Sequence, residues 1–366
     1  MNRELALSTL MQILEWDEET AIKEAKWLKF ASEFKYDGYR EFLAGARFLE
    51  RLAYWLQQFV QQDRQAAYDF VREKLVFYSA GEINHLASQF YFKVVKPHVC
   101  IALADSQGLP PYLVWQHPDA QVRFSEILRR SLFFGLSDGA RTDLIRRSGS
   151  GNISNEQVVL YPQISANKWG DLAKDLREAT GDPTACFDRI FLIDDFSASG
   201  MSIIRNREDG SWKGKLPRFF EECEEQLNDI VSKQCSLHFH HFIATRRAKA
   251  HIEKQAEIWR AERDLPIKLE FSWGIEFPNS MVITSDGCPD LWKLTEEYYD
   301  LNVMNKSMKV GSEHAKRGFS ECALPIILEH NTPNNSVSLL WAETSGGEGI
   351  HAMRPLFIRK QRHWED

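Results

Sequence analysis

The chain has 366 residues, of which 43% are hydrophobic and 27% charged, with 20 Gly and 13 Pro. These proportions exclude collagenous, low-complexity and disordered classes and indicate a globular protein with a sizeable core. The length suggests two or three structural units, with a single large unit as the alternative. The formal net charge of −7 gives no chain-wide basic field, so polynucleotide binding is not the first expectation, although a local basic patch stays open.

Cysteine usage and hydropathy bear on the compartment. The six cysteines are dispersed without any CxxC pair, so neither a zinc ribbon nor a disulfide framework is expected. No stretch has the roughly 18 apolar residues of a membrane span, and the start has no apolar core behind a basic leader. We expect a cytoplasmic protein without a membrane partner.

Region 1–104 has few Gly or Pro, and its apolar residues recur three and four apart with charged residues between them. This spacing predicts an all-helical N-terminal region. Its many aromatic side chains are expected in the core, and the alternative is that some of them face a protein partner or a second copy of the chain.

In region 105–262, strand patterns alternate with helix patterns. The strands are expected at 131–136, 158–164, 189–193 and 237–244, and the helices at 139–147, 168–179, 217–231 and 246–262. This alternation predicts an α/β fold with a parallel sheet and right-handed crossovers. Region 263–366 is a mixed extension, with a strand expected near 267–272, a helix at 289–300 and an apolar run at 324–328.

The most informative segment is FLIDDFSASGMS, residues 191–202. An apolar strand ends in two acids, Asp194 and Asp195. It then enters a loop of mostly small or hydroxylated residues that is expected to open a helix: Ser197, Ala198, Ser199, Gly200, Met201 and Ser202. Such loops converge N–H and hydroxyl groups on a phosphate, and carboxylates accept hydrogen bonds from ribose hydroxyls. Together these groups suggest a phosphorylated ribose, while the alternative is an acidic turn that caps a helix.

This segment resembles the phosphoribosyl-pyrophosphate (PRPP) loop of type I phosphoribosyltransferases. The resemblance implies that Asp194 and Asp195 hold the ribose 2′ and 3′ hydroxyls and that residues 197–202 bind the 5′-phosphate. Phe196 is bulkier than the family's usual small aliphatic residue, and Ser199 replaces the usual Thr. The family also implies Mg²⁺ held mainly through the ligand, so no protein cage for a metal is expected.

Upstream, residues 131–147 predict a strand, a tight turn at Ser137, Asp138 and Gly139, and a helix. By the resemblance this turn is the pyrophosphate loop. Arg141 would meet the pyrophosphate and complete the catalytic set with Asp194 and Asp195. Residues 146–159 are polar and glycine-rich and occupy the position of the family's flexible catalytic loop, and a plain surface loop is the alternative.

Two further segments carry polar chemistry. The insertion 205–219 contains Arg205, Arg207, Lys213, Lys215 and Arg218, and it either recruits an anionic substrate or is a solvated loop. In 237–249, His238 and His240 share one strand face and His241 the other, so a zinc site would need a ligand from elsewhere, and a strand between two covered faces is expected. Arg246 and Arg247, at the strand's carboxyl end, are better placed for a ligand.

Segment 318–343 combines an apolar strand with dense amides. It offers base-reading or acceptor-side candidates with Trp341 or Phe357 to stack on the base, although amides also cap turns: His330, Asn331, Asn334, Asn335 and Trp341. The combination resembles a bacterial group of phosphoribosyltransferase-like proteins with a C-terminal extension. Members of that group are encoded near anti-phage defence modules, including retrons.

Three functions follow as hypotheses. The first is an enzyme that binds PRPP or a related phosphorylated ribose with Mg²⁺ and reacts at the ribose C1. The second is a non-catalytic sensor of PRPP or a nucleotide. The third is an interaction protein whose helical N-terminal region docks a reverse transcriptase or another partner. The fold alone does not decide among them.

Overall fold

The computed structural model describes residues 3–40, 47–149, 151–160, 166–224, 229–265 and 267–359. The chain divides into two compact units, Met1–Glu82 with Pro278–Asp366, and Ile83–Phe277. This division differs from the sequence-based boundaries after 104 and after 262. The helical residues up to 104 include helices that pack on the sheet, and the strand after 262 joins that sheet.

The first unit is built from both ends of the chain. Its elements are α1 (Arg3–Leu14), α2 (Glu18–Phe34), α3 (Phe48–Leu56), α4 (Gln61–Glu73), β1 (Val76–Tyr78), α12 (Pro289–Glu297) and β9 (Ile326–Leu328). Strands β1 and β9 pair in parallel, with Val76 opposite Ile326. The indole N–H of Trp55 donates to the Leu339 carbonyl at 2.7 Å inside one shared apolar core. The N-terminal helices and the C-terminal extension are therefore one folded body.

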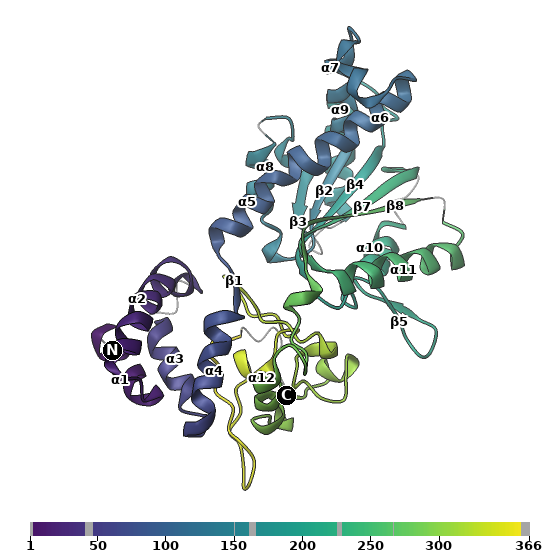
Figure 1. Ribbon diagram of the computed structural model, residues 1–366. Coiled ribbons are helices and arrows are strands. Elements are labelled where there is room, and N and C mark those ends of the chain that lie inside the picture. The colour runs from purple at the N-terminus through teal and green to yellow at the C-terminus, as the bar shows by residue number, and fades with distance from the viewer. Residues whose placement is uncertain are drawn as a thin grey trace. The chain divides into compact units, whose positions relative to one another are not determined.

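The second unit contains the predicted parallel sheet, which is confirmed, with strand order β3-β2-β4-β7-β8 (Figure 1). The strands are β2 (Ser131–Gly135), β3 (Val158–Leu160), β4 (Phe187–Ser197), β7 (Val231–Thr245) and β8 (Lys268–Phe277). The second predicted strand extended to residue 164, and its residues 161–164 lie outside the described residues. The predicted helix 217–231 was too long at its end: α10 is described to Glu224, residues 225–228 lie outside the described residues, and Val231 already begins β7.

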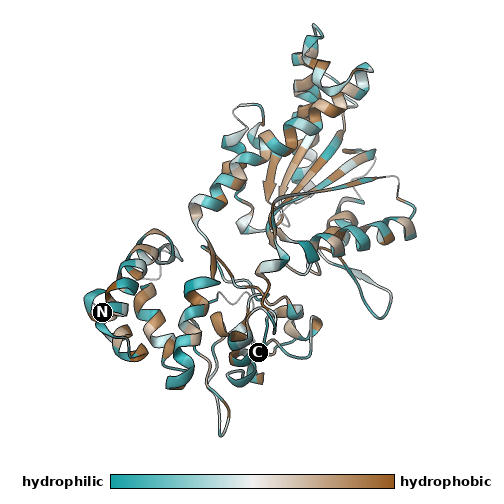
Figure 2. Ribbon diagram, in the orientation of Figure 1, coloured by the Kyte–Doolittle hydropathy of each residue, from teal (hydrophilic) through white to brown (hydrophobic). Residues whose placement is uncertain are grey.

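Helices cover both faces of this sheet, which explains why β2 and the middle of β4 are apolar on both faces (Figure 2). One face packs on α5 (Ala80–Phe90) and α6 (Lys96–Gln107), where Phe90 contacts Phe133 and Phe191. The other face packs on the remaining long helices of the unit, α9 (Ala166–Thr180), α10 (Lys215–Glu224) and α11 (Arg246–Glu262). Helices α7 (Ala120–Arg129) and α8 (Thr142–Ser148) flank β2 in the chain.

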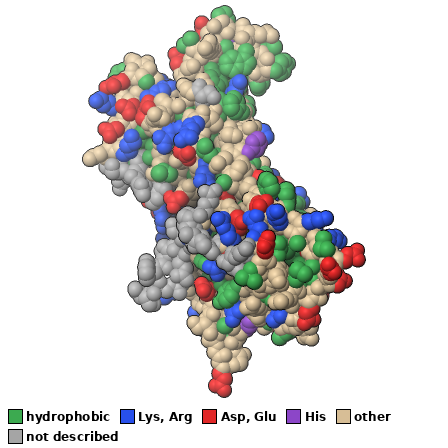
Figure 3. All heavy atoms as spheres, turned by 90° about the vertical axis from the view of Figure 1, so that its left-hand side faces the viewer, with side chains coloured by type: hydrophobic (Ala, Val, Ile, Leu, Met, Phe, Trp, Pro, Cys, Tyr) green, Lys and Arg blue, Asp and Glu red, His purple; other side chains and the backbone are tan. Residues whose placement is uncertain are grey.

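On the face drawn in Figure 3, acidic and basic side chains are interspersed rather than gathered by sign. None of the described helices combines the length and the apolarity that a bilayer crossing requires.

Candidate functional site

The segments that follow β2 and β4 begin at the same edge of the sheet. The two strands pair in parallel from Ser131 opposite Arg189 to Gly135 opposite Ile193, and the N–H of Leu136 donates to the Ile193 carbonyl at 2.8 Å. Open α/β sheets bind ligands beyond the carboxyl ends of their strands. The two predicted loops are thus brought to the edge where a ligand is expected.

Asp195 is the point where these loops meet. The hydroxyl of Ser137 donates to Asp195 Oδ1 at 3.2 Å. A Cβ on Gly139 would lie 2.2 Å from Asp195 Oδ2, so only glycine permits this approach. Asp138, between them, is exposed. The structure therefore brings together three of the predicted residues, two from the pyrophosphate loop and one from the acidic pair.

Arg141 has a strained backbone at the end of the same loop. Its φ of 49° and ψ of 46° lie in the left-handed region, which costs a residue with a side chain about 1 kcal/mol. The short 3-10 turn Asp138–Ala140 precedes it, and α8 follows directly. Such conformations concentrate at ligand sites, which agrees with the expected position of Arg141 beside a pyrophosphate.

Asp194 points to the opposite face of the sheet from Asp195, because successive strand residues alternate. It is 2% exposed, its Oδ2 pairs with Lys215, and its Oδ1 is buried without a hydrogen-bond partner. Asp195 is 9% exposed. The two carboxylates thus have different surroundings, whereas the sequence suggested the same kind of contact for both.

The segment after β4 departs from one expectation. No helix follows it directly: Gly200 accepts from the N–H groups of Ile203 and Ile204 in a single turn, and the chain continues into β5 (Arg205–Asn206). The Ser197 hydroxyl is buried without a partner, and within the described part of the chain the N–H groups of Gly200 and Ser202 meet no acceptor. Any anion here would be bound by hydroxyls and turn N–H groups rather than by a helix dipole.

Helix α11 supports this turn from behind. Thr245 caps the helix by accepting from the Ala248 N–H at 3.0 Å, and its hydroxyl donates to the Ala198 carbonyl at 2.6 Å. His251 Nε2 donates to the Ile204 carbonyl at 2.9 Å. Gly200 has a φ of +77°, and a Cβ there would lie 3.0 Å from the Ala248 carbonyl oxygen. The loop is held to the helix at three points.

The basic insertion is partly built into the site. It forms the hairpin β5 and β6 (Trp212–Lys213), and the Lys215 N–H at its end donates to the Ser202 carbonyl at 3.0 Å. Arg205 donates to the Met201 carbonyl at 2.8 Å, and burial lowers its pKa. Three other basic residues of the insertion are exposed: Arg207, Lys213 and Arg218. Sequence spacing gave no signal that Lys215 pairs with Asp194, 21 residues away.

The histidines of β7 alternate as predicted. His238 and His240 both contact the Ser272 hydroxyl, whereas His241 stacks on Trp273 with ring centroids 5.3 Å apart on the other face. His241 is fully buried opposite Asp194, both its ring nitrogens have no partner, and burial lowers its pKa to about 4. Arg246, expected at the ligand edge, pairs with Glu276 at 2.9 Å and is largely exposed.

The described part of 146–159 is anchored rather than loose. Ile153 is 4% exposed, and Gln157 donates to the carbonyls of Leu128 at 2.9 Å and Ser131 at 2.7 Å. Arg129 pairs with Glu156 at 2.9 Å. Ser150 lies outside the described residues. Residues 153–157 are thus tied to neighbouring elements, whereas Gly151 and Asn152 are exposed, and ligand-dependent movement of the segment stays a prediction.

In the first unit, the amide segment has internal partners. The Asn335 amide donates to the Phe319 carbonyl at 3.3 Å, and the Asn334 amide donates to Met308 Sδ at 3.4 Å. The backbone carbonyl of Asn334 accepts from the Phe319 N–H at 2.6 Å, and the backbone of Asn331 closes a turn with Leu328. Trp341 is 8% exposed and donates to the Ser336 carbonyl at 2.8 Å. Phe357, 3% exposed, and Trp341 are both core side chains, and His330 lies 3.3 Å from Glu329. The expected base-side groups thus have structural contacts here.

Comparison with known proteins agrees with the edge geometry. No curated protein and no solved structure matches the chain significantly. The family model PRTase-CE, phosphoribosyltransferases with a C-terminal extension, matches residues 52–359, which is well over half of the chain. It spans both loops of the sheet edge and the C-terminal part of the first unit. The chain therefore belongs to the PRTase-CE family.

Proposed function

We propose that this protein binds PRPP, or a closely related phosphorylated ribose, at the edge formed by the β2 and β4 loops and reacts at the ribose C1. The observation that carries the proposal is Asp195, held between the loops by Ser137 and Gly139, on the same strand face as the partnerless Ser197 hydroxyl. A carboxylate for sugar hydroxyls and a donor for phosphate thus lie two residues apart.

The other residues receive roles from their surroundings. The turn Ser199–Ser202, with its spare N–H groups, binds the 5′-phosphate, and the loop Ser137–Gly139 with Arg141 faces the pyrophosphate. Asp195 accepts a ribose hydroxyl, and Lys215 holds Asp194 and adds positive charge to the edge. A ligand held between the two loops has its C1 oriented for attack and is less accessible to water.

The donor set also fits Mg²⁺, which prefers carboxylate oxygens and substrate phosphates. Asp195 lies at the pyrophosphate loop and is the chain's candidate to hold the ion together with the ligand, whereas the buried Asp194 points to the opposite face of the sheet and pairs with Lys215. Bound Mg²⁺ would neutralise charge on the leaving pyrophosphate.

Calorimetric titration of the full-length protein with PRPP and Mg²⁺ tests the proposal. Asp195→Asn should weaken binding about tenfold or more, because a charge-assisted hydrogen bond is worth about 1.5–3 kcal/mol. Asp194→Asn should weaken binding less and lower the melting temperature, because Lys215 loses its partner. Asp188→Asn, at the other end of the same strand, is the matched control and should bind as wild type. Unchanged affinity in Asp195→Asn would contradict the assignment.

A second function, partner docking, is favoured by one observation on α2. Phe30 and Phe34 are 61% and 69% exposed and contact each other at 4.8 Å, one helical turn apart. Exposed apolar pairs of this kind occur where another protein binds. A reverse transcriptase of a retron is the partner class that the resemblance implies, and co-purification with and without Phe30→Ser/Phe34→Ser would test it while PRPP affinity serves as the control.

A further inference from the structure

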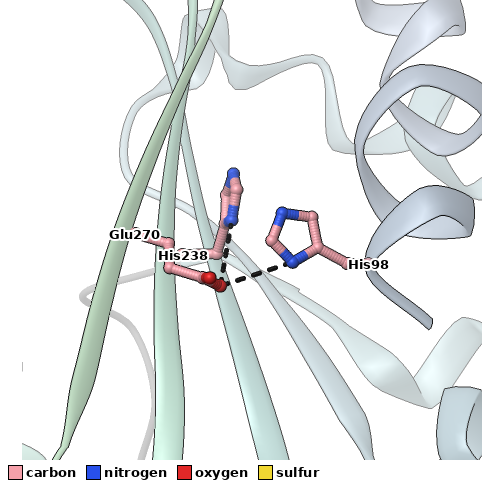
Figure 4. Close-up of side chains that lie close together, drawn as sticks. All are labelled: His98, His238 and Glu270. Atoms are coloured by element: carbon pink, nitrogen blue, oxygen red, sulfur yellow. Dashed lines mark ion pairs between the residues drawn. The ribbon is translucent and has the colours of Figure 1, made fainter. Parts of the chain in front are cut away.

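Three side chains from three elements converge on the sheet face that α5 and α6 cover (Figure 4). They are His98 of α6, His238 of β7 and Glu270 of β8. His98 Nδ1 lies 3.3 Å and His238 Nδ1 3.8 Å from Glu270 Oε2. One ligand atom from each residue lies within 4.8 Å of the others. The second and third groups that His238 of β7 would need for a metal therefore come from α6 and β8.

The register of the sheet fixes this arrangement. His238 pairs with Glu270 across the parallel β7 and β8 strands, so the two side chains stand side by side on one face. His98 approaches from the helix, and its ring contacts that of His238 edge to face, with centroids 4.3 Å apart. Two of the three groups are thus held by the sheet, and the third is positioned by a packed helix.

The hydrogen bonds around His238 leave one nitrogen for a ligand. The side chain is 4% exposed, and its Nε2 hydrogen-bonds with Ser272 Oγ at 2.6 Å. Its Nδ1 is buried without a hydrogen-bond partner and faces Glu270 (Figure 4). In histidines that bind metals, one ring nitrogen binds the ion and the other makes a hydrogen bond, as Nε2 does here with Ser272. That hydrogen bond fixes the orientation of the ring and its tautomer. Ser272 also contacts His240 Nδ1 at 2.7 Å, which orients the hydroxyl.

We propose that His98, His238 and Glu270 bind one Zn²⁺ ion, with water in the fourth position. Two imidazoles and one carboxylate form a ligand set that is common for zinc. Mg²⁺ and Ca²⁺ prefer oxygen ligands, so two imidazole nitrogens make these ions poor candidates. In a tetrahedral site with bonds of about 2.0 Å, neighbouring ligand atoms lie about 3.3 Å apart. The His98 to Glu270 separation already has this value, and the His238 to Glu270 separation is 0.5 Å longer.

The surroundings permit entry of the ion without disturbing the core. The side chains of His98 and Glu270 are 28% and 21% exposed. Lys268 pairs with the other oxygen of Glu270, Oε1, at 2.6 Å, so Oε2 stays directed at the histidines. The ion would join α6 to two strands of the sheet. His238 pairs with Phe191, three residues before Asp194 on β4, so the proposed site is separate from the phosphoribosyl edge and independent of its function.

The full-length protein, stripped with a chelator, should bind one equivalent of Zn²⁺ in a calorimetric titration and melt at a higher temperature with zinc than without. Co²⁺ in its place should give the visible absorption of a four-coordinate ion. His98→Ala, which removes a partly exposed ligand, should weaken zinc binding at least about 100-fold. Glu270→Gln keeps the shape of the side chain but removes its charge, and it should also weaken binding.

His85→Ala, a substitution of an exposed histidine on α5, is the matched control and should bind zinc as wild type. Loss of stoichiometric binding in His98→Ala and in Glu270→Gln, but not in His85→Ala, would support the site. No zinc binding by the wild type, or equal affinity in wild type and His98→Ala, would overturn it and leave an ion-pair cluster. PRPP affinity measured on the same variants should not change, which separates this site from the proposed function.

Discussion

The loop edge of the sheet and the amide segment of the first unit were both predicted as ligand sites from their polar residues, but their polar groups differ in hydrogen bonding. At the edge, Ser197 and Asp194 keep buried oxygen atoms without partners. In the amide segment, Asn335 and Trp341 donate to nearby backbone carbonyls. A buried polar group without a partner costs free energy, and at the edge a ligand would supply the missing partner. The comparison teaches that the edge loop keeps polar groups for a ligand, whereas the Asn335 amide and the Trp341 indole are already paired within the protein.

The largest effect is expected for Gly139→Ala, which attacks the loop edge directly. The new Cβ would overlap the Asp195 carboxylate, so the loop must move away, at a cost of about 1–3 kcal/mol. PRPP binding should fall more than tenfold, and the melting temperature should fall with it. Titration calorimetry and thermal unfolding measure the two effects.

Gly170→Ala provides the matched control for this change. Gly170 lies in α9 with nothing within 4 Å of its Cβ position, and alanine there should raise stability by about 0.5–1 kcal/mol without altering PRPP affinity. A Gly139→Ala protein that binds PRPP as tightly as wild type would mean that the two loops do not share a ligand.

His241 should make stability depend on pH, because it is the most deeply buried group without partners on this strand. Burial lowers its pKa from 6.5 to about 4 in the folded state, so unfolding takes up a proton between these values. The free energy of unfolding that depends on neutral His241 is fully present above pH 6.5. It falls by up to about 3 kcal/mol as the pH falls toward 4. Urea unfolding at pH 7 and pH 5 measures this loss.

His241→Phe keeps the ring stacked on Trp273 and removes the titrating nitrogens, so its stability should fall less on acidification than that of wild type. His85→Ala, at an exposed position, should leave the pH dependence unchanged. If wild type and His241→Phe lose the same free energy of unfolding between pH 7 and pH 5, His241 has a partner that keeps its pKa near 6.5.

The smallest effect is expected for Asn335→Ala in the amide segment. It removes the bonds to the Phe319 carbonyl and to Cys322 Sγ, which should cost about 1 kcal/mol of unfolding free energy. PRPP affinity should be unchanged within twofold. A large loss of PRPP or acceptor binding with unchanged stability would instead assign the segment to ligand recognition and erase the contrast with the loop edge.

Much of the sheet was predictable from the sequence, because its elements follow local patterns. The alternation of apolar strands and amphipathic helices in 131–262 predicted the parallel sheet, and both loops follow the carboxyl ends of predicted strands, which meet at one edge of such a sheet. The missing helix after Gly200 was not predictable, since Ser and Gly favour a single turn as readily as a helix start. The ion pair of Lys215 with Asp194 depends on the β5–β6 hairpin, which brings the chain back beside the end of β4. The spacing of residues in the sequence does not predict this contact.

The shared core of the first unit was equally hidden. Its apolar helix faces were visible in the sequence, but amphipathic spacing says only that a face is buried and not against which segment. Trp341, considered as a base-stacking group, instead joins the same core as Trp55. Long-range partners of this kind follow from the fold and not from local periodicity.

The pairing of β1 with β9 makes the sheet unit an insertion within the first unit, and this has a consequence for biosynthesis. Residues 83–277 leave the ribosome before Ile326 does, so Val76 waits for its strand partner while the whole sheet unit is made. During that interval the apolar faces of α3 and α4 lack the C-terminal segment that covers them. The nascent chain therefore exposes apolar surface late in translation, and chaperones should bind its N-terminal helices until the C-terminal segment has emerged.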